Sequence, residues 1–450
     1  MAAKDPKVTI TRFWKLLESE KKDIGNIYLY ALFNGLLSLS IPLGIQAIIN
    51  LIQSGTTSTS WAVLVIVVLI GLALAGVFQI FQLSVAERIQ QRLFINASME
   101  FAYRIPRLKL SALKSYYPPE LINRFFDVLT VQKGLYKLLF DFSVASLQIV
   151  FGLILLSLYH PFFIAFGFFL IAILALFFRL TSRRGLETSL EESNYKYQVA
   201  GWLEELARNL STFKMAGTTN LPLEQTDVVS GKYLKARRAH FRVLIRQYSS
   251  LIFFKVLIAG GLLLLGGLLV FDQQMNIGQF VAAEIVIVQI ISSVEKLVYS
   301  IETIYDVLTG LEKLGAVTDL ELENHDEKEQ VALENGSDLA VKLKNVKLIS
   351  PQWGHTILED INFEVKPGEK VGITGAMASG KSSMLQLIAG LFDSFEGSLL
   401  YNNTPYRKVR LESLRSLIGD NLRQEEIFEA SLLENISLRR ASVKEEQVMQ

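Results

Sequence analysis

The sequence contains no cysteine in its 450 residues. A chain without cysteine has no disulfide framework, no thiolate metal site and no cysteine nucleophile, so the protein classes that depend on them are excluded. It also lacks an excess of charge of either sign, because 45 Lys and Arg stand against 44 Asp and Glu, for a net charge of +1. Without surplus cations to neutralise phosphates, nucleic acid is not an expected partner.

Charged side chains are missing from long parts of the chain, and 50% of the residues are hydrophobic. A helix that crosses the hydrocarbon needs about 20 apolar residues, and charges there are costly. No Asp, Glu, Lys or Arg occurs in residues 24–86 or 142–178, and the polar run 53–60 and the pair at 160–161 divide these stretches. Pro42 should kink the first of the resulting segments. With two further apolar segments, the sequence predicts six transmembrane helices, at about 27–52, 61–85, 142–159, 162–180, 251–271 and 277–299.

The orientation follows from Lys and Arg, which favour the cytoplasmic side of short loops. The three short connections contain none, whereas residues 87–137 contain nine and residues 179–246 contain twelve. We therefore predict that both long loops and both termini are cytoplasmic, with residues 1–25 as an amphipathic segment rather than a secretory signal. The alternative is that these segments are buried helices of a large soluble protein. That alternative does not explain why connections rich in Lys and Arg alternate with connections that contain none.

Both long loops have the composition of helices. Residues 77–105 contain no Gly or Pro, and a helix over 61–105 would be about 67 Å long against a hydrocarbon thickness of about 30 Å. The second loop is predicted to be helical to about Met215, to break at 217–222 and to resume through the basic stretch 232–246. Each loop is thus a helical hairpin whose tip is either a docking surface or a solvated charged face.

The composition changes after the sixth span. Residues 318–338 are rich in acids and are expected to form a solvated linker. Beyond it, short apolar alternations predict strands from Leu339 to Val346, at 361–365 and at 370–374. Residues 339–450 are therefore assigned to a second, α/β domain, which follows a membrane domain at 26–317.

The last of these predicted strands leads into a glycine loop and then an apolar helix. Successive N–H groups of such a loop form an anion site at the positive end of a helix. In the P-loop pattern, Lys381 reaches the β- and γ-phosphates and the Ser382 hydroxyl ligates Mg²⁺. An ordinary glycine-rich turn is the alternative. The predicted nucleotide-binding residues are Gly375, Ala376, Met377, Ala378, Ser379, Gly380, Lys381, Ser382 and Ser383.

Six spans with long cytoplasmic helices, followed by this loop, resemble a half-transporter of the ATP-binding cassette (ABC) exporter family. The resemblance covers nearly the whole chain and implies an α-helical membrane domain joined to the first part of an α/β nucleotide-binding domain. It also implies ATP and Mg²⁺ as ligands, ATP-driven export of a substrate, and a second half-transporter as partner in a homodimer or heterodimer. The expected location is a lipid bilayer, in the bacterial inner membrane.

The sequence departs from the family pattern at several positions. Arg423 occupies the place of the Mg²⁺-sensing glutamine, with Gln424 next to it, and Ser350 that of the adenine-stacking aromatic, with Trp353 nearby. Ala378 replaces a third loop glycine. The acidic pair and the signature loop of the family do not appear before residue 450, so catalytic residues are unknown and hydrolysis by the chain as written is not expected. A non-hydrolysing structural or regulatory half is therefore the rival hypothesis.

The sixth span carries acids on one face. Glu284, Glu295 and Glu302 lie within about 20° of one another on a helix, and Glu284 lies about 10 Å from Ile277 along its axis. A carboxylate at that depth favours an interior or water-lined position. Glu284 is therefore predicted to line a substrate cavity, the alternative being an ion pair with a base such as Lys255. Peptide, lipid and drug substrates all remain open.

Overall fold

The computed structural model describes residues 6–55, 59–113, 118–323, 330–333, 339–350, 354–419, 427–440, 443 and 445–448. The chain divides into two compact units. The first comprises Met1–Pro106 and Tyr117–Asp319, and the second comprises Arg107–Tyr116 and Leu320–Gln450. The tip of the first long loop therefore belongs to the second unit.

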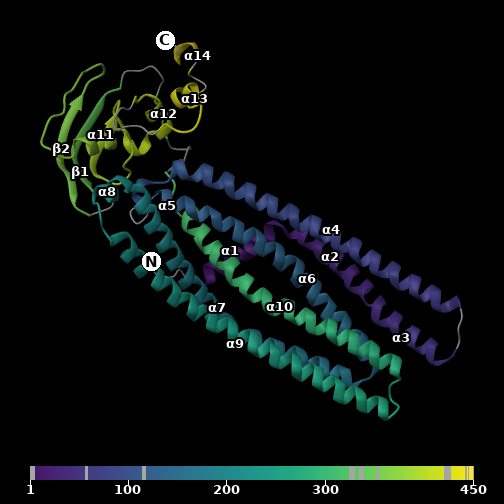
Figure 1. Cartoon of the computed structure of the whole chain (residues 1–450). Helices are drawn as coiled ribbons and strands as arrows, with labels where there is room; N and C mark the ends of the chain where they lie inside the picture. The colour runs from purple at the N-terminus through teal and green to yellow at the C-terminus, as the bar shows by residue number, and fades with distance from the viewer. Residues whose placement is uncertain are drawn as a thin grey trace. The chain divides into compact units, whose positions relative to one another are not determined.

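The described residues of the first unit are helical almost throughout (Figure 1). Its α-helices are α1 (Pro6–Ser19), α2 (Lys21–Ser38), α3 (Ser40–Gln53), α4 (Thr59–Arg104), α5 (Pro118–Asn123), α6 (Asp127–Tyr159), α7 (Phe162–Arg208), α8 (Leu210–Met215), α9 (Leu221–Phe271) and α10 (Ile277–Thr318). Short 3₁₀ helices, η1 (Ile105–Arg107), η2 (Leu110–Leu113) and η3 (Arg124–Phe126), occur in the first loop.

Five helical segments in the described part of the chain are long and apolar enough to cross a membrane. The fourth of the six predicted spans, 162–180, lies in α7, where the described apolar stretch Phe162–Ile173 is shorter. The five long candidates coincide with the other five predicted spans, and this shorter stretch begins where the fourth predicted span begins. The first span is interrupted at Leu39, between α2 and α3. This break lies three residues before Pro42, which has no N–H to continue the helix.

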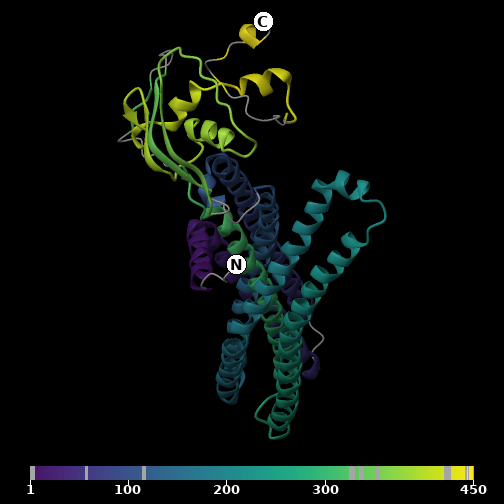
Figure 2. The same cartoon turned by 90° about the vertical axis from the view of Figure 1, so that its left-hand side faces the viewer.

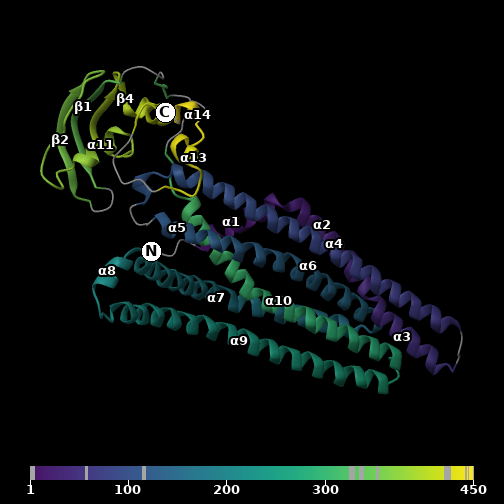
Figure 3. The same cartoon turned by 45° about the horizontal axis from the view of Figure 1, so that its top comes forward.

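The long loops are continuations of the membrane helices, as predicted. α4 has 46 residues and ends at Arg104, just before Pro106, which corresponds to about 69 Å. α7 and α9 lie side by side, and α8 lies at the tip that joins them (Figures 1 and 3). Figure 2 shows this hairpin, in teal, beside the other helices of the unit. α4, α7 and α9 are therefore stiff extensions of their spans.

Small residues allow the helices at the centre of the first unit to approach closely. A Cβ at Gly134 of α6 would lie 2.3 Å from Val307 Cγ2 of α10, and one at Gly310 would lie 2.8 Å from Val131 Cγ2. Side-chain hydrogen bonds add to this packing, for example from Ser293 Oγ to an amide oxygen on α6 at 2.9 Å. Close packing and polar bonds are the main sources of helix association in membranes, where apolar burial supplies little.

The second unit contains a four-stranded antiparallel sheet in the order β2-β1-β3-β4. Its elements are β1 (Val341–Ile349), β2 (Thr356–Val365), α11 (Lys381–Ile388), β3 (Glu396–Tyr401), β4 (Thr404–Pro405), η4 (Tyr406–Lys408), α12 (Leu411–Ser416), α13 (Leu432–Ser437) and α14 (Glu445–Val448). Leu343 of β1, Leu399 of β3 and Leu387 of α11 are fully buried in one core. This core holds α11 against the sheet.

Two strand predictions are confirmed by β1 and β2, and the third is wrong. Residues 370–374 are not assigned to any strand, although they carry the apolar alternation. A strand needs a hydrogen-bonded neighbour, and no described segment pairs with these residues. Val371 is accordingly 52% exposed. The sequence pattern reports the tendency of a segment to pair, not whether a neighbour is present.

From Leu320 onward, the described residues of the acidic segment 318–338, which was expected to be solvated, belong to the second unit. Leu322 pairs with Leu108 in an antiparallel bridge, and Val331 pairs with Val409 in a parallel one. Leu333 is 8% exposed. The prediction of a solvated linker rested on the many acids of this segment and did not take account of its few apolar residues, which pack or pair with the second unit.

We predict that Gly185→Ala destabilises the helical unit, because a Cβ there would lie 2.1 Å from the buried ring of Tyr305. Overpacking of this kind costs about 1–3 kcal/mol. Gly201→Ala, in the same helix, meets nothing within 4 Å and should stabilise the helix by about 1 kcal/mol. Thermal unfolding of both variants in detergent should give shifts of opposite sign, and equal shifts would contradict the packing.

Candidate functional site

The predicted phosphate loop lies between the extended residues 370–374 and α11. Gly380 is the N-cap of α11 and adopts a left-handed conformation with φ of 87°. A Cβ at this position would lie 2.8 Å from Leu358 Cδ2 and 3.0 Å from the carbonyl oxygen of Ile357. Both the backbone conformation and the approach of β2 therefore require glycine.

The N-terminus of α11 offers unpaired backbone donors. The first hydrogen bond of the helix ladder runs from Met384 N to Gly380 O at 2.9 Å. The N–H groups of Lys381, Ser382 and Ser383 precede it and have no partner within the helix. Together with the helix dipole, such donors make a site for an anion such as phosphate.

The Lys381 ammonium group is folded back over the loop. Its Nζ donates to the carbonyl oxygens of Gly375 at 2.9 Å and Ala376 at 2.7 Å, and it lies 3.4 Å from Ser379 Oγ. These bonds hold one positive charge directly over the nine-residue loop. Carbonyl oxygens are neutral acceptors, so a phosphate oxygen would be the stronger partner for this ammonium group.

The rest of the loop is open to solvent. Met377 is 97% exposed, and the Ser382 side chain is also exposed. Ala378 adopts φ of +61°, the left-handed region that glycine occupies without strain. Ala378, at the position of the family's third loop glycine, thus adopts this conformation at a cost of about 1–2 kcal/mol.

The fit to Mg-ATP rests on this set of groups. The loop supplies backbone donors, one ammonium group and the Ser382 hydroxyl, a combination that suits a phosphate chain with a metal held mainly by phosphate and water. No group of three or more metal-binding side chains occurs among the described residues.

Of the predicted adenine-stacking and Mg²⁺-sensing positions, Ser350 alone lies within the described residues. Ser350 directly follows β1, at the start of the β1–β2 connection, where its N–H donates to His355 O at 2.8 Å, and it is 7% exposed. A small buried side chain offers no surface for adenine to stack on. Trp353, Arg423 and Gln424 lie outside the described residues.

The three acids of the sixth span differ in their side-chain partners. Glu295 is paired with Lys255, and Glu302 accepts a hydrogen bond from the Tyr248 hydroxyl at 3.1 Å. The alternative ion pair proposed for Glu284 is therefore wrong, because Lys255 takes Glu295. Glu284 is exposed and, within the described part of the chain, neither an ion pair nor a hydrogen bond involves its side chain. The helical spacing found the stripe of acids, but it did not identify the partner.

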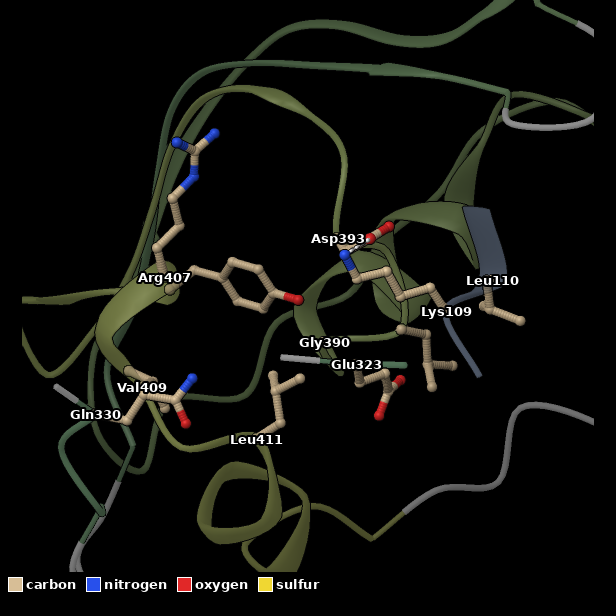
Figure 4. Close-up of a pocket in the computed structure, with 11 residues that line it drawn as sticks. Lys109, Leu110, Glu323, Gln330, Gly390, Asp393, Arg407, Val409 and Leu411 are labelled. Carbon is tan, nitrogen blue, oxygen red and sulfur yellow. Dashed lines mark ion pairs between the residues drawn. The ribbon is translucent and has the colours of Figure 1, made fainter. Parts of the chain in front are cut away.

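Sequence reasoning missed a cavity of about 230 Å³ in the second unit, away from the phosphate loop. Its lining includes Lys109, Glu323, Asp393, Tyr406 and Arg407 (Figure 4). The Lys109 Nζ lies 3.9 Å from an Asp393 carboxylate oxygen, and Figure 4 shows these two groups directed toward each other. These residues come from three distant parts of the sequence, so no local motif could have indicated the cavity.

Comparison with known proteins supports the assignment of both parts of the chain. The family model "ABC transporter transmembrane region" matches residues 24–294, and the model "ABC transporter" matches residues 358–450. The chain is 22% identical over 449 residues to the transport/processing ATP-binding protein ComA of Streptococcus pneumoniae serotype 4, covering 97% of this chain and 60% of that protein. The chain thus spans about three fifths of the length of this relative.

Two further similarities cover different parts. The alpha-hemolysin translocation ATP-binding protein HlyB of Escherichia coli O157:H7 is 27% identical over 186 residues, which are 41% of this chain and 26% of that protein. A solved structure of a bacterial Atm1-family ABC exporter with ATP bound superposes with a TM-score of 0.79 at 18% identity, covering 95% of this chain and 75% of that one.

At this identity the superposition shows the fold, and it is the fold of an ABC exporter. The transmembrane-region model covers more than half of the chain, and the second model includes the phosphate loop from Gly375 to Ser383. From these matches and from the helical and α/β units described above, we conclude that this protein is a member of the ABC transporter family.

Proposed function

We propose that this chain is one half of a dimeric transporter that uses ATP to export a substrate across a membrane. The observation that carries the proposal is the union, in one chain, of long apolar helices with a loop that aims backbone donors and Lys381 at one point. The first part provides a path through a bilayer, and the second a place for a nucleotide. The similarity to a transport/processing ATP-binding protein, to a translocation ATP-binding protein and to a bacterial Atm1-family ABC exporter supports the proposal of export.

The residues of the loop would divide the work of nucleotide binding. The free N–H groups at the start of α11 would hold phosphate oxygens, and Lys381 would exchange the carbonyls of Gly375 and Ala376 for the β- and γ-phosphates. Ser382 would ligate Mg²⁺, which, when bound, neutralises the charge of the phosphates. Adenine would gain little from Ser350, so we expect modest affinity for the base.

The partner is proposed to be a second half-transporter. Glu284 supports this, because an exposed carboxylate at membrane depth would be costly against lipid and requires a partner chain or a water-filled cavity. Exposed apolar residues of the long helices, such as Val67 and Phe253, can face lipid or a partner helix.

A non-hydrolysing half remains the second candidate, favoured by the buried Ser350 at the adenine position. Phosphate release by the assembled protein, compared with the same preparation of Lys381→Ala, separates the two. Release that depends on Lys381 supports the transporter, whereas nucleotide binding without release supports the non-hydrolysing half.

The proposed location is the bacterial inner membrane with both termini in the cytoplasm, because the long basic loops are predicted to be cytoplasmic. Glu284 is proposed to contact substrate. Its side chain is exposed and, among the described residues, takes part in neither an ion pair nor a hydrogen bond, and its charge favours cationic groups on the substrate.

Lys381→Ala should lower nucleotide affinity by about 10- to 100-fold, since hydrogen bonds to charged groups contribute about 1.5–3 kcal/mol. Membrane insertion and thermal stability should not change, because the ammonium group bonds only to exposed loop atoms. Titration with a fluorescent ATP analogue measures the affinity. Lys370→Ala, exposed in the same unit, is the control, and an equal effect of both variants would count against the site.

Single cysteines in this cysteine-free chain test the orientation. Gln274, exposed in the turn between α9 and α10, should react with an impermeant maleimide from outside intact cells when replaced by cysteine. Ser58 should behave in the same way and Ser115 should react only after permeabilisation, although both lie outside the described residues. The reverse pattern would overturn the proposed topology.

Glu284→Gln should reduce transport of cationic substrates several-fold while leaving the thermal unfolding midpoint unchanged, because its carboxylate has no partner within the described protein. Glu295→Gln should instead lower the midpoint, since it leaves Lys255 without its counter-ion at membrane depth. Uptake into inverted vesicles and unfolding in detergent give the two readouts. If Glu284→Gln destabilises as much as Glu295→Gln, Glu284 has a structural role instead.

A further inference from the structure

The segment that follows α10 is joined to the helix that carries the phosphate loop. Five residues after the end of α10, the Glu323 carboxylate accepts two hydrogen bonds from Arg415 of α12, at 2.7 and 2.8 Å. The Glu323 side chain is 11% exposed. A bidentate pair with limited exposure is geometrically specific and stronger than an open ion pair.

Arg415 continues this connection to α11. Its Nη2 also donates to the carbonyl oxygen of Gly390 at 2.8 Å. Gly390 terminates α11 in a left-handed conformation, with φ of 71° and its N–H bonded to Leu387 O at 3.0 Å. The bond to Glu323 is the largest cause that raises the pKa of Arg415 above its ordinary value. The guanidinium group of Arg415 thus binds both the segment that leaves α10 and the C-terminal end of α11.

α11 links this point to the phosphate loop. It has eight residues from Lys381 to Ile388, so it is about 12 Å long. Leu387 is buried in the core, and the Tyr401 hydroxyl donates to Ile388 O at 2.5 Å. A short helix fixed in this way moves as a unit, so a shift at its N-terminus reaches Gly390.

The tip of the first loop is joined to the same segment. Leu108 and Leu322 face each other in an antiparallel bridge, with Lys109 N bonded to Glu321 O at 3.1 Å and Glu323 N to Arg107 O at 2.8 Å. Ser111 Oγ donates to Asp393, just beyond α11, at 3.1 Å. The chain entering from α4 and the chain leaving α10 are therefore paired next to the end of α11.

The cavity of about 230 Å³ lies at this junction, lined by Lys109, Glu323, Gly390 and Asp393 (Figure 4). The segment is consequently held by polar bonds around a space and not by dense packing. Removing one such bond should change how the segment moves while leaving the core of the second unit intact.

We propose that Glu323 and Arg415 form a positioning pair for transport, which passes a displacement of α11 to the chain leaving α10 and, through the Leu108–Leu322 pairing, to the chain entering from α4. The proposal rests on ATP-driven transport as proposed above. It assigns to the pair the transmission of movement, not the binding of nucleotide.

Charge removal tests the pair. Glu323→Gln and Arg415→Gln should each reduce ATP-dependent transport at least tenfold, with nucleotide affinity within about twofold of wild type. The double variant should lose no more than either single one, because both remove the same interaction. Glu412→Gln, exposed on the same helix α12, is the control. Unchanged transport, or a parallel loss of affinity and thermal stability, would overturn the proposal.

A disulfide provides an independent test in this cysteine-free chain. Opposed residues of such a non-hydrogen-bonded antiparallel pair have Cα atoms about 4.5 Å apart, which suits a disulfide. Leu108→Cys with Leu322→Cys should cross-link on mild oxidation and retain transport, because the two segments are proposed to move together. Loss of transport on cross-linking, with recovery on reduction, would show that they must separate and would contradict the pairing.

These outcomes separate the two proposals. If the wild type transports nothing in an ATP-dependent manner, the proposed function fails. The proposed Leu108–Leu322 step of the transmission is then tested by the rate at which the two introduced cysteines cross-link, with and without ATP and Mg²⁺. Equal rates agree with two segments that stay together. A slower rate with nucleotide contradicts the proposal.

Discussion

The helical unit depends on one constraint, that backbone N–H and C=O groups at membrane depth must find partners within the protein. Continuous helices satisfy it, and within the described residues the one interruption of a predicted span lies at Leu39, three residues before Pro42, which has no N–H to donate. Because α4, α7, α9 and α10 continue far beyond the hydrocarbon without a break, their cytoplasmic ends are stiff. A displacement at the cytoplasmic end of one of these helices is therefore a displacement of its span.

Much of this architecture could be predicted from the sequence, because its causes are local. The absence of charge marks the spans, the lack of Gly and Pro gives α4 its length, and glycine at 380 marks the one position where β2 and the backbone conformation exclude a side chain. The errors concern partners. Residues 370–374 have the pattern of a strand without a described neighbour, and Lys255 pairs with Glu295 across 40 positions. Amino-acid composition and hydrophobic periodicity carry no information on which distant residue will be the partner in a strand pairing or an ion pair.

The phosphate loop illustrates the difference between a site that is formed and one that is complete. Its conformation is already fixed, with Ala378 in a left-handed backbone and Lys381 bonded to two carbonyl oxygens. Its surroundings are open, since Met377 and Val371 are largely exposed. A phosphate site needs only the loop, whereas hydrolysis needs groups that position water and exclude solvent. The loop alone accordingly supports binding, and the exposed faces around it are where further protein surface would act.

The acidic segment after α10 shows which charges matter at this junction. Asp319 is paired with Arg12, Glu321 with Lys109 and Glu323 with Arg415. The Glu321 side chain is 75% exposed, and such a pair contributes no more than about 1 kcal/mol and weakens with salt. Glu323 is mostly buried, and its partner Arg415 also holds Gly390. Removing Glu323 would leave a partly buried guanidinium group with only one of these two partners, which costs more than the loss of an exposed pair. The segment is acidic along its length. Glu323 is the acid to which we assign the transmission of movement, because it is mostly buried and its partner also binds Gly390.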